Sequence, residues 1–190
     1  RPRDIVTREA LENAAVVVAA SGGSTNGGLH LPAIAHEAGI DFDLDEVCAI
    51  FRRTPYIADL KPAGRYVAKD MYEVGGVPAL LKALYDGGFI HGTCLTVTGL
   101  TVAENIENVE LPVDQDVIRP TSDPLSTTGG VVGLKGSLAP QGAIVKIAGL
   151  SELKFRGPAR CFDSEEACFE AVSRREYKEG EVLVIRYEGP

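Results

Sequence analysis

Residues 21–32 read Ser-Gly-Gly-Ser-Thr-Asn-Gly-Gly-Leu-His-Leu-Pro, a glycine-rich polar loop that runs directly into an apolar, helix-like stretch. The four glycines free the backbone to adopt positive φ angles, while Ser24, Thr25 and Asn26 carry two hydroxyls and an amide. A helix that begins near Leu29 would direct its free N–H groups and positive dipole end toward the loop. That arrangement suits a carboxylate or a phosphate. The same residues are normal in a helix-capping turn, which local physics alone favours.

The spacing of apolar residues predicts that residues 1–110 are mainly helical. A first helix is expected from the cap at Thr7 to Ala20, a second over residues 29–38 stopped by Gly39, and a third after the cap at Asp43 that ends at Thr54-Pro55. Residues 64–85 indicate two short helices divided at Gly75-Gly76, residues 94–98 a short strand, and residues 101–104 a capping box that opens a last short helix.

The pattern changes after residues 111–128, which are rich in Pro, Asp, Ser and Thr and indicate a linker or a long crossing loop. Short β-rich runs follow at 131–135, 143–148, 159–162 and 182–187, with one helix over 164–174 that Asp163 can cap. A strand-rich unit with a covering helix, after a helical first part, predicts an α/β fold.

Composition narrows the class of protein. The chain of 190 residues has a formal net charge of −8, which argues against generic nucleic-acid binding and against electrostatic docking on anionic membranes. No apolar run approaches the ~20 residues that span a bilayer, so a soluble, cytoplasmic protein is expected. The chain begins with Arg1-Pro2-Arg3 and ends directly after a strand-like run, and both ends are expected to be cut from something longer.

The cysteines and histidines indicate no metal centre of their own. Cys48, Cys94, Cys161 and Cys168 follow no common zinc spacing and are predicted to be buried free thiols. His30 and His36 are six residues apart and therefore do not share a helix face. His30, beside the glycine-rich loop, is the better candidate for a substrate contact, although a satisfied histidine at a helix start is the commoner case.

Two charged segments are further candidates. Lys61 and Arg65, on either side of a rigid turn, would suit an acidic substrate, with a surface ion-pair cluster as the more common alternative. Glu188, at the end of a strand, would bind a metal or orient a partner, or form a salt bridge with Arg186 or Arg160. No paired-carboxylate motif, nucleophile elbow or P-loop is present, so the chain carries no self-sufficient catalytic constellation.

A series of longer motifs resembles the dihydroxy-acid dehydratase and phosphogluconate dehydratase family. The matching blocks cover nearly the whole chain in the family's order: GGSTN at 22–26, LHLPAIAHEAGI at 29–40, RTPYIADLKPAGRYVAKDMYEVGGVPALLKAL at 53–84, HGTCLTVTG at 91–99, TVAEN at 101–105, TGGVVGLKGSLAPQGAIVKIAG at 128–149, GPARCFDSEEA at 157–167 and VIRYEGP at 184–190.

The resemblance implies part of a hydro-lyase that converts 2,3-dihydroxy acids to 2-keto acids in branched-chain amino-acid biosynthesis. It implies an iron–sulfur cluster and Mg²⁺ in the full-length enzyme, which is expected to be a homodimer that acts on a small-molecule dihydroxy acid. Residues 1–110 would form the helical end of an N-terminal α/β domain, and residues 115–190 part of a C-terminal swivelling β/β/α domain. The active site would lie between these domains.

The resemblance also limits what this chain can do. The family's cluster cysteines and its Cys-Asp-Lys motif lie upstream of GGSTN, and its Gly-Pro-Gly-Met-x-Glu and Thr-Asp-Gly-Arg-x-Ser-Gly motifs lie downstream of Pro190; none occurs in this sequence. No catalytic or metal-binding residue is therefore assigned, no cofactor is expected on this chain alone, and the isolated chain is predicted to be inactive.

The site residues predicted here are Ser24, Thr25, Asn26 and His30, as contacts to the substrate's acid group. Two alternatives to a dihydroxy-acid dehydratase remain open. One is a sugar-acid dehydratase that acts on phosphogluconate or a pentonate, and the other is a non-catalytic binding module derived from the family.

Overall fold

The computed structural model of this chain describes residues 1–188 and divides into two compact units, Arg1–Leu150 and Ser151–Pro190. The first unit contains α1 (Pro2–Ile5), α2 (Arg8–Ala20), α3 (Gly27–Ala38), α4 (Leu44–Arg53), α5 (Ala68–Glu73), α6 (Gly76–Asp86), α7 (Val102–Ile106), β1 (Val131–Gly136) and β2 (Ala139–Lys146). The second contains β3 (Ala159–Phe162), α8 (Glu165–Ser173) and β4 (Val182–Ile185). The predicted α/β class is confirmed, and the division into domains 1–110 and 115–190 stays a prediction.

The helices of the first unit begin and end where the sequence predicts. The Thr7 side chain accepts a hydrogen bond from the backbone N–H of Ala10 at the start of α2, and Asp43 and Glu46 form a reciprocal capping box at the start of α4. Gly39 ends α3 in the left-handed conformation, with φ of 73°. Three differences remain. α3 begins two residues before the predicted Leu29, α5 begins at Ala68 rather than near residue 64, and the short helix α1 was not predicted.

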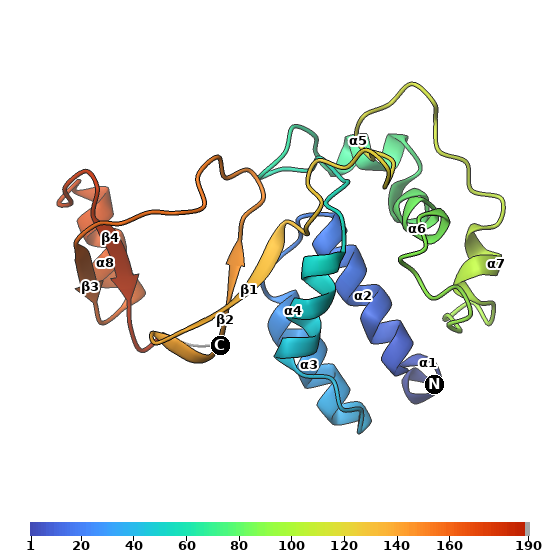
Figure 1. The fold of residues 1–190 in the computed structure, drawn as a ribbon, viewed down its shortest axis with the longest axis horizontal. Coiled ribbons are helices and arrows are strands. Elements are labelled where there is room, and N and C mark those ends of the chain that lie inside the picture. Colours follow the sequence, from blue (N-terminus) through green and yellow to red (C-terminus); the bar gives the residue numbers. More distant parts are fainter. Residues whose placement is uncertain (189–190) are drawn as a thin grey trace. The chain divides into compact units, whose positions relative to one another are not determined.

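The core of the first unit lies between these helices and the hairpin. Helices α2, α3 and α4 pack against one another, and β1 packs on α4 (Figure 1). The largest fully buried side chains come from α4, the following segment, α6, the predicted linker and β1: Val47, Phe51, Thr54, Ile57, Leu84, Ile118 and Val131. Residues 111–128 are therefore a crossing loop that supplies core residues, since Ala58 also forms a β-bridge with Ile118.

The strand predicted over residues 94–98 is wrong. Only an isolated antiparallel bridge between Leu95 and Thr101 is present there. The Asn105 amide donates to the hydroxyl of Thr96 and accepts from the hydroxyl of Thr98. These side-chain bonds hold the segment as a turn, since Thr and Asn side chains compete with backbone ladders for hydrogen bonds.

Asn13 joins α2 to a segment 78 residues further along the chain. Its side chain is buried and accepts from the backbone N–H of His91 at 2.8 Å while donating to the carbonyl of His91 at 3.0 Å. We expect Asn13→Ala to lower the free energy of unfolding by about 1 kcal/mol, because it leaves two partly buried backbone groups of His91 without their partners. Urea unfolding measures this. Asn13→Asp should be at least as unstable as Asn13→Ala, because it turns a carboxylate oxygen toward the carbonyl of His91. A destabilisation by Asn13→Ala below ~0.5 kcal/mol would contradict this account.

The second unit is a small parallel β-α-β element. β3 pairs with β4 in register from Ala159–Val182 to Phe162–Ile185, and α8 contacts both strands. Ser164 caps α8 by accepting from the N–H of Ala167, so the prediction of Asp163 as the cap is wrong. Asp163 instead accepts from the Arg186 guanidinium at 2.8 Å, a stronger charge-assisted partner.

Candidate functional site

The glycine-rich loop, residues 21–26, joins α2 to α3 at a place where other backbone segments come very close. Gly22 has φ of +58°, and a Cβ built on it would lie 2.9 Å from Cε2 of Tyr56. A Cβ on Gly130 would lie 2.7 Å from the Cα of Gly22. Glycine is required at both positions because no side chain fits between the loop, the Tyr56 ring and the start of the hairpin.

The loop itself forms a compact turn that starts α3. Gly27 donates its N–H to the carbonyl of Ser24 at 3.1 Å, and Gly28 donates to the carbonyl of Thr25 at 3.0 Å. The Ser24 hydroxyl accepts from the N–H of Asn26 at 3.2 Å. The first N–H groups of the helix are therefore used within the turn. The expectation that they point freely at a ligand is wrong, since the capping alternative accounts for them.

A depression of about 470 Å³ lies beside this turn. It is lined by Ser21, Gly22, Gly23, Ser24, Thr25, Leu60, Lys61, Pro62 and Lys146, and we call it the loop depression. All of these residues belong to the first unit. The loop depression thus combines the hydroxyls of the glycine-rich loop with two lysines from distant parts of the sequence.

Backbone hydrogen bonds hold both lysines in place. Lys61 donates its N–H to the carbonyl of Tyr66 at 2.7 Å within a closed loop over residues 59–66, and its peptide bond to Pro62 is cis. Lys146 ends β2, where the N–H groups of Ile147 and Ala148 both donate to the carbonyl of Gly130. The N–H of Gly130 donates in turn to the carbonyl of Ala19 at the end of α2. The end of β2 is therefore fixed next to the loop.

Lys61 and Lys146 differ from Arg65 in whether a carboxylate pairs with them. Within residues 1–188, no carboxylate lies within 4.0 Å of the ammonium of Lys61 or Lys146. Arg65 pairs with both Asp59 and Asp116, and these hydrogen bonds raise the pKa of its guanidinium. Hydrogen bonds from Tyr66 and then Arg65 lower the pKa of Asp116. Arg65 thus follows the ion-pair alternative, whereas Lys61 is available to an anion.

A buried hydroxyl without a partner lies directly behind the loop. Tyr56 is 7% exposed, and its Oη has no hydrogen-bond partner among the described residues. Burial raises the pKa of this phenol, which therefore remains a neutral donor at ordinary pH. Such orphaned polar groups are rare and costly in folded proteins.

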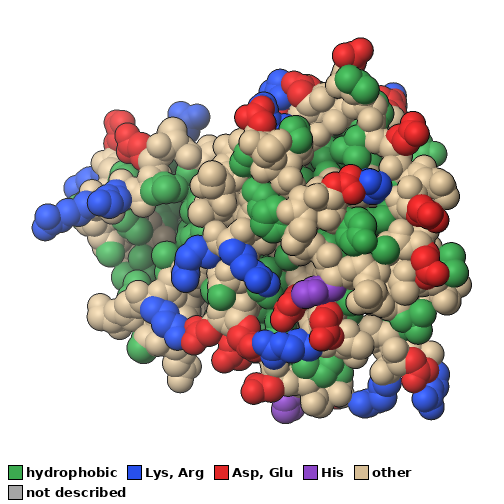
Figure 2. Space-filling model, turned by 45° about the vertical axis from the view of Figure 1, so that its right-hand side comes forward, with side chains coloured by type: hydrophobic (Ala, Val, Ile, Leu, Met, Phe, Trp, Pro, Cys, Tyr) green, Lys and Arg blue, Asp and Glu red, His purple; other side chains and the backbone are tan. Residues whose placement is uncertain are grey.

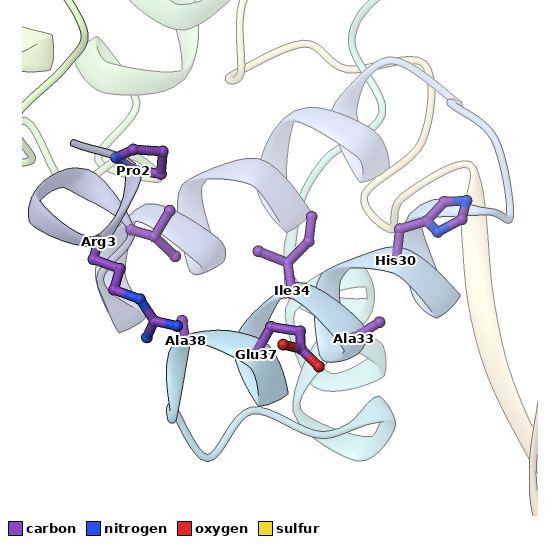
Figure 3. Close-up of a pocket in the computed structure, with 8 residues that line it drawn as sticks. Pro2, Arg3, His30, Ala33, Ile34, Glu37 and Ala38 are labelled. Atoms are coloured by element: carbon purple, nitrogen blue, oxygen red, sulfur yellow. The ribbon is translucent and has the colours of Figure 1, made fainter.

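The four site residues predicted from sequence do not all meet. Ser24 and Thr25 line the loop depression, while Asn26 is exposed at the N-cap of α3 and makes no side-chain cap hydrogen bond. His30 lines a separate, mostly apolar groove of about 460 Å³ between α1 and α3, with Pro2, Arg3, Ile34 and Glu37 among its neighbours (Figure 3). Sequence reasoning missed Lys146, because a lysine within a β-rich run carries no local signal.

The remaining candidates have structural partners. Glu188 accepts from the backbone N–H of Glu165 at the start of α8, so the predicted pairing with Arg186 or Arg160 is wrong. Cys48, Cys94 and Cys168 are buried free thiols as predicted, but Cys161 is exposed.

The described residues do not fit a resident metal or cluster. Across residues 1–188 no group of three or more His, Cys, Asp or Glu side chains is arranged to hold a metal ion. The described residues therefore supply no complete ligand set of their own for the iron–sulfur cluster or the Mg²⁺ that the resemblance implies.

Two further features concern the distribution of charged side chains on the surface and the length of the helices. On the face in Figure 2, acidic and basic side chains are interspersed with apolar ones. None of the helices over residues 1–188 has the length and apolar character that crossing a bilayer requires.

Comparison with known families identifies the class of protein. Residues 1–105 match the dihydroxy-acid/6-phosphogluconate dehydratase N-terminal family model, and residues 116–190 match the corresponding C-terminal model. The chain belongs to this dehydratase family.

Individual relatives define the resemblance further. A dihydroxy-acid dehydratase of Parvibaculum lavamentivorans is 72% identical over 192 residues, covering all of this chain and 33% of the relative. Dihydroxy-acid dehydratase 2 of Mesorhizobium japonicum is 71% identical, and a dihydroxy-acid dehydratase of Dinoroseobacter shibae is 64% identical, again over the whole chain. The chain spans about a third of the length of these relatives.

Proposed function

We propose that this chain is the middle portion of a dihydroxy-acid dehydratase, which removes water from a 2,3-dihydroxy acid in branched-chain amino-acid biosynthesis. In that reaction C2 loses a proton and C3 loses its hydroxyl group, and the resulting enol tautomerises to a 2-keto acid. The observation that carries the proposal is the identity of 72% to a protein of that name over the entire chain. The full-length protein is proposed to be cytoplasmic and homodimeric, with an iron–sulfur cluster and Mg²⁺ bound by segments outside these residues.

Within this proposal, the chain contributes binding rather than the chemical step. Ser24 and Thr25 are proposed to contact the substrate's acid group from the loop depression, which they line. Asn26 and His30 remain proposed contacts to the substrate at the start of α3, outside that depression. The proton acceptor at C2 is not assigned to any residue of this chain.

An exchange experiment tests the proposal. The matching 192 residues of the Parvibaculum lavamentivorans relative are replaced by this chain, and formation of 2-keto acid from 2,3-dihydroxyisovalerate is measured. We expect the exchanged enzyme to keep activity within about tenfold of its parent, and the isolated chain, supplied with iron, sulfide and Mg²⁺, to give none. Turnover by the isolated chain, or an exchanged enzyme that folds and is inactive, would contradict the proposal.

The same exchanged enzyme separates the two alternatives. Preference for 6-phosphogluconate or a pentonate over 2,3-dihydroxyisovalerate would favour a sugar-acid dehydratase, a substrate class that the family description also names. A folded but inactive exchange product would favour a non-catalytic binding module.

A further inference from the structure

We infer that the loop depression binds the carboxylate of a small hydroxy acid, with Lys61 and Lys146 as its two cations. The inference rests on the proposed function only for the chemical class of the ligand. The charges, hydroxyls and backbone of the first unit support the anion site itself.

The charges of the first unit favour an anion in the loop depression. The chain carries a formal net charge of −8, and many of its cations are paired with carboxylates, as Arg8, Arg65, Lys82 and Lys135 are. Lys61 and Lys146 converge on one depression without such a partner within residues 1–188. Two like charges that share a depression repel each other, and an anion between them relieves that repulsion. Lys146 is also half-buried, so an anion near it is screened less by solvent than one on an open surface.

The neutral groups around the lysines suit a carboxylate. The Thr25 hydroxyl lines the depression and is not bonded to any other described residue, and Ser24 adds a second hydroxyl beside it. A hydroxyl donates one hydrogen bond and accepts others, so this pair can bind a carboxylate oxygen and the adjacent 2-hydroxyl of a hydroxy acid. The side of the depression formed by Leu60 and Pro62 is apolar and accommodates an alkyl chain.

Tyr56 supports the glycine-rich loop from behind. Its ring packs directly against Gly22, the residue that forms part of the depression's wall. Its buried hydroxyl lacks any partner in the described residues. Because this hydroxyl is sealed from solvent and Tyr56 is not among the residues that line the depression, the ring fixes the position of the loop and does not contact the ligand.

The loop depression is also lined by residues from both segments of the chain that match the family models. The glycine-rich loop and Lys61 come from residues matched by the N-terminal family model, while Lys146 comes from those matched by the C-terminal model. Because β2 is tied to the end of α2 through Gly130, the second cation is held by backbone hydrogen bonds. Binding is therefore expected without rearrangement of the hairpin.

The direct test uses the ¹⁵N-labelled chain titrated with sodium lactate, at an ionic strength kept constant with sodium chloride. We expect saturable shifts of the backbone amides of Gly22, Gly23 and Thr25. Lys61→Gln and Lys146→Gln should each weaken lactate binding about fivefold, which corresponds to about 1 kcal/mol, and the double variant should lose it. Lys146→Arg should keep most of the affinity because it keeps the charge.

Lys154→Gln is the matched control, because it removes the same charge from an exposed lysine of the second unit. It should leave the lactate affinity unchanged; equal weakening by this control, or no saturable shift with lactate, would overturn the inference. Inorganic phosphate is the second probe. Weaker binding of phosphate supports a carboxylate site, whereas phosphate that displaces lactate at lower concentration overturns that assignment.

Failure of this inference can be told from failure of the proposed function. In the exchanged enzyme, Lys61→Gln and Lys146→Gln should raise KM for 2,3-dihydroxyisovalerate about fivefold with a smaller effect on kcat, as expected for lost binding of the substrate's acid group. An active exchanged enzyme with unaltered KM overturns the site alone. An inactive exchanged enzyme, together with lactate binding by the isolated chain, contradicts the function and leaves the site standing.

Discussion

Gly64→Ala should lower the free energy of unfolding by about 3 kcal/mol, because the added methyl group would meet backbone atoms that cannot move aside. A Cβ at this position would lie 2.3 Å from the carbonyl carbon of Asp59 and 2.5 Å from its oxygen. That carbonyl already accepts from the N–H groups of Arg65 and Tyr66, so relieving the contact breaks the closed loop over residues 59–66. Urea unfolding followed by circular dichroism measures the change.

The same substitution is expected to affect the loop depression, since Lys61 lies within the closed loop. Lactate binding by Gly64→Ala should therefore weaken at temperatures where the protein is still folded. Gly136→Ala is the control, because nothing lies within 4 Å of a Cβ built there; it should change the unfolding free energy by less than ~0.5 kcal/mol. A Gly64→Ala protein as stable as this control would show that the loop adjusts freely.

Gly133→Ala should also destabilise the first unit by about 3 kcal/mol, through the contact between β1 and α4. A Cβ on Gly133 would lie 2.0 Å from Sγ and 2.5 Å from Cβ of Cys48. The Cys48 side chain is buried on α4, so the strand must move away from the helix to make room. Thermal unfolding of the variant, again beside Gly136→Ala in the same strand, measures this effect.

A double-mutant cycle assigns the effect to this pair. Cys48→Ala removes the nearer of the two clashing atoms, so the cost of Gly133→Ala should be smaller in the Cys48→Ala background than in the parent protein. The rescue should be incomplete because the Cβ of residue 48 remains 2.5 Å from the new methyl group. Strictly additive effects would show that the destabilisation arises elsewhere, for instance in the backbone preference of the strand.

Local sequence signals predicted most of the elements. Thr7, Asp43 and Thr101 are capping residues whose side chains bond to the backbone three residues on, and such contacts depend only on neighbours in the chain. Gly39 ends its helix for the same local reason. Errors arose where two local options competed: Asp163 and Ser164 are both good caps, and the distant Arg186 engages Asp163.

The candidate site was predicted in part. Ser24 and Thr25 were identified because a glycine-rich polar loop before a helix is a strong local pattern, and both line the loop depression. The nearness of His30 to the loop in sequence predicts a contact there, but its place one turn into α3 turns it toward the α1 groove (Figure 3). Lys146 lies 120 positions beyond the loop and gives no sign of its role until β2 is placed.

The sequence by itself therefore determined the family, the α/β class and the ends of most helices, because motifs, caps and hydrophobic spacing are properties of the chain. Only the tertiary structure decided which charged groups meet. It paired Arg65 with two carboxylates and left Lys61 and Lys146 on one depression without such a partner within residues 1–188. Ion pairs and anion sites depend on distances between segments far apart in the chain, and those distances are set by how the core packs.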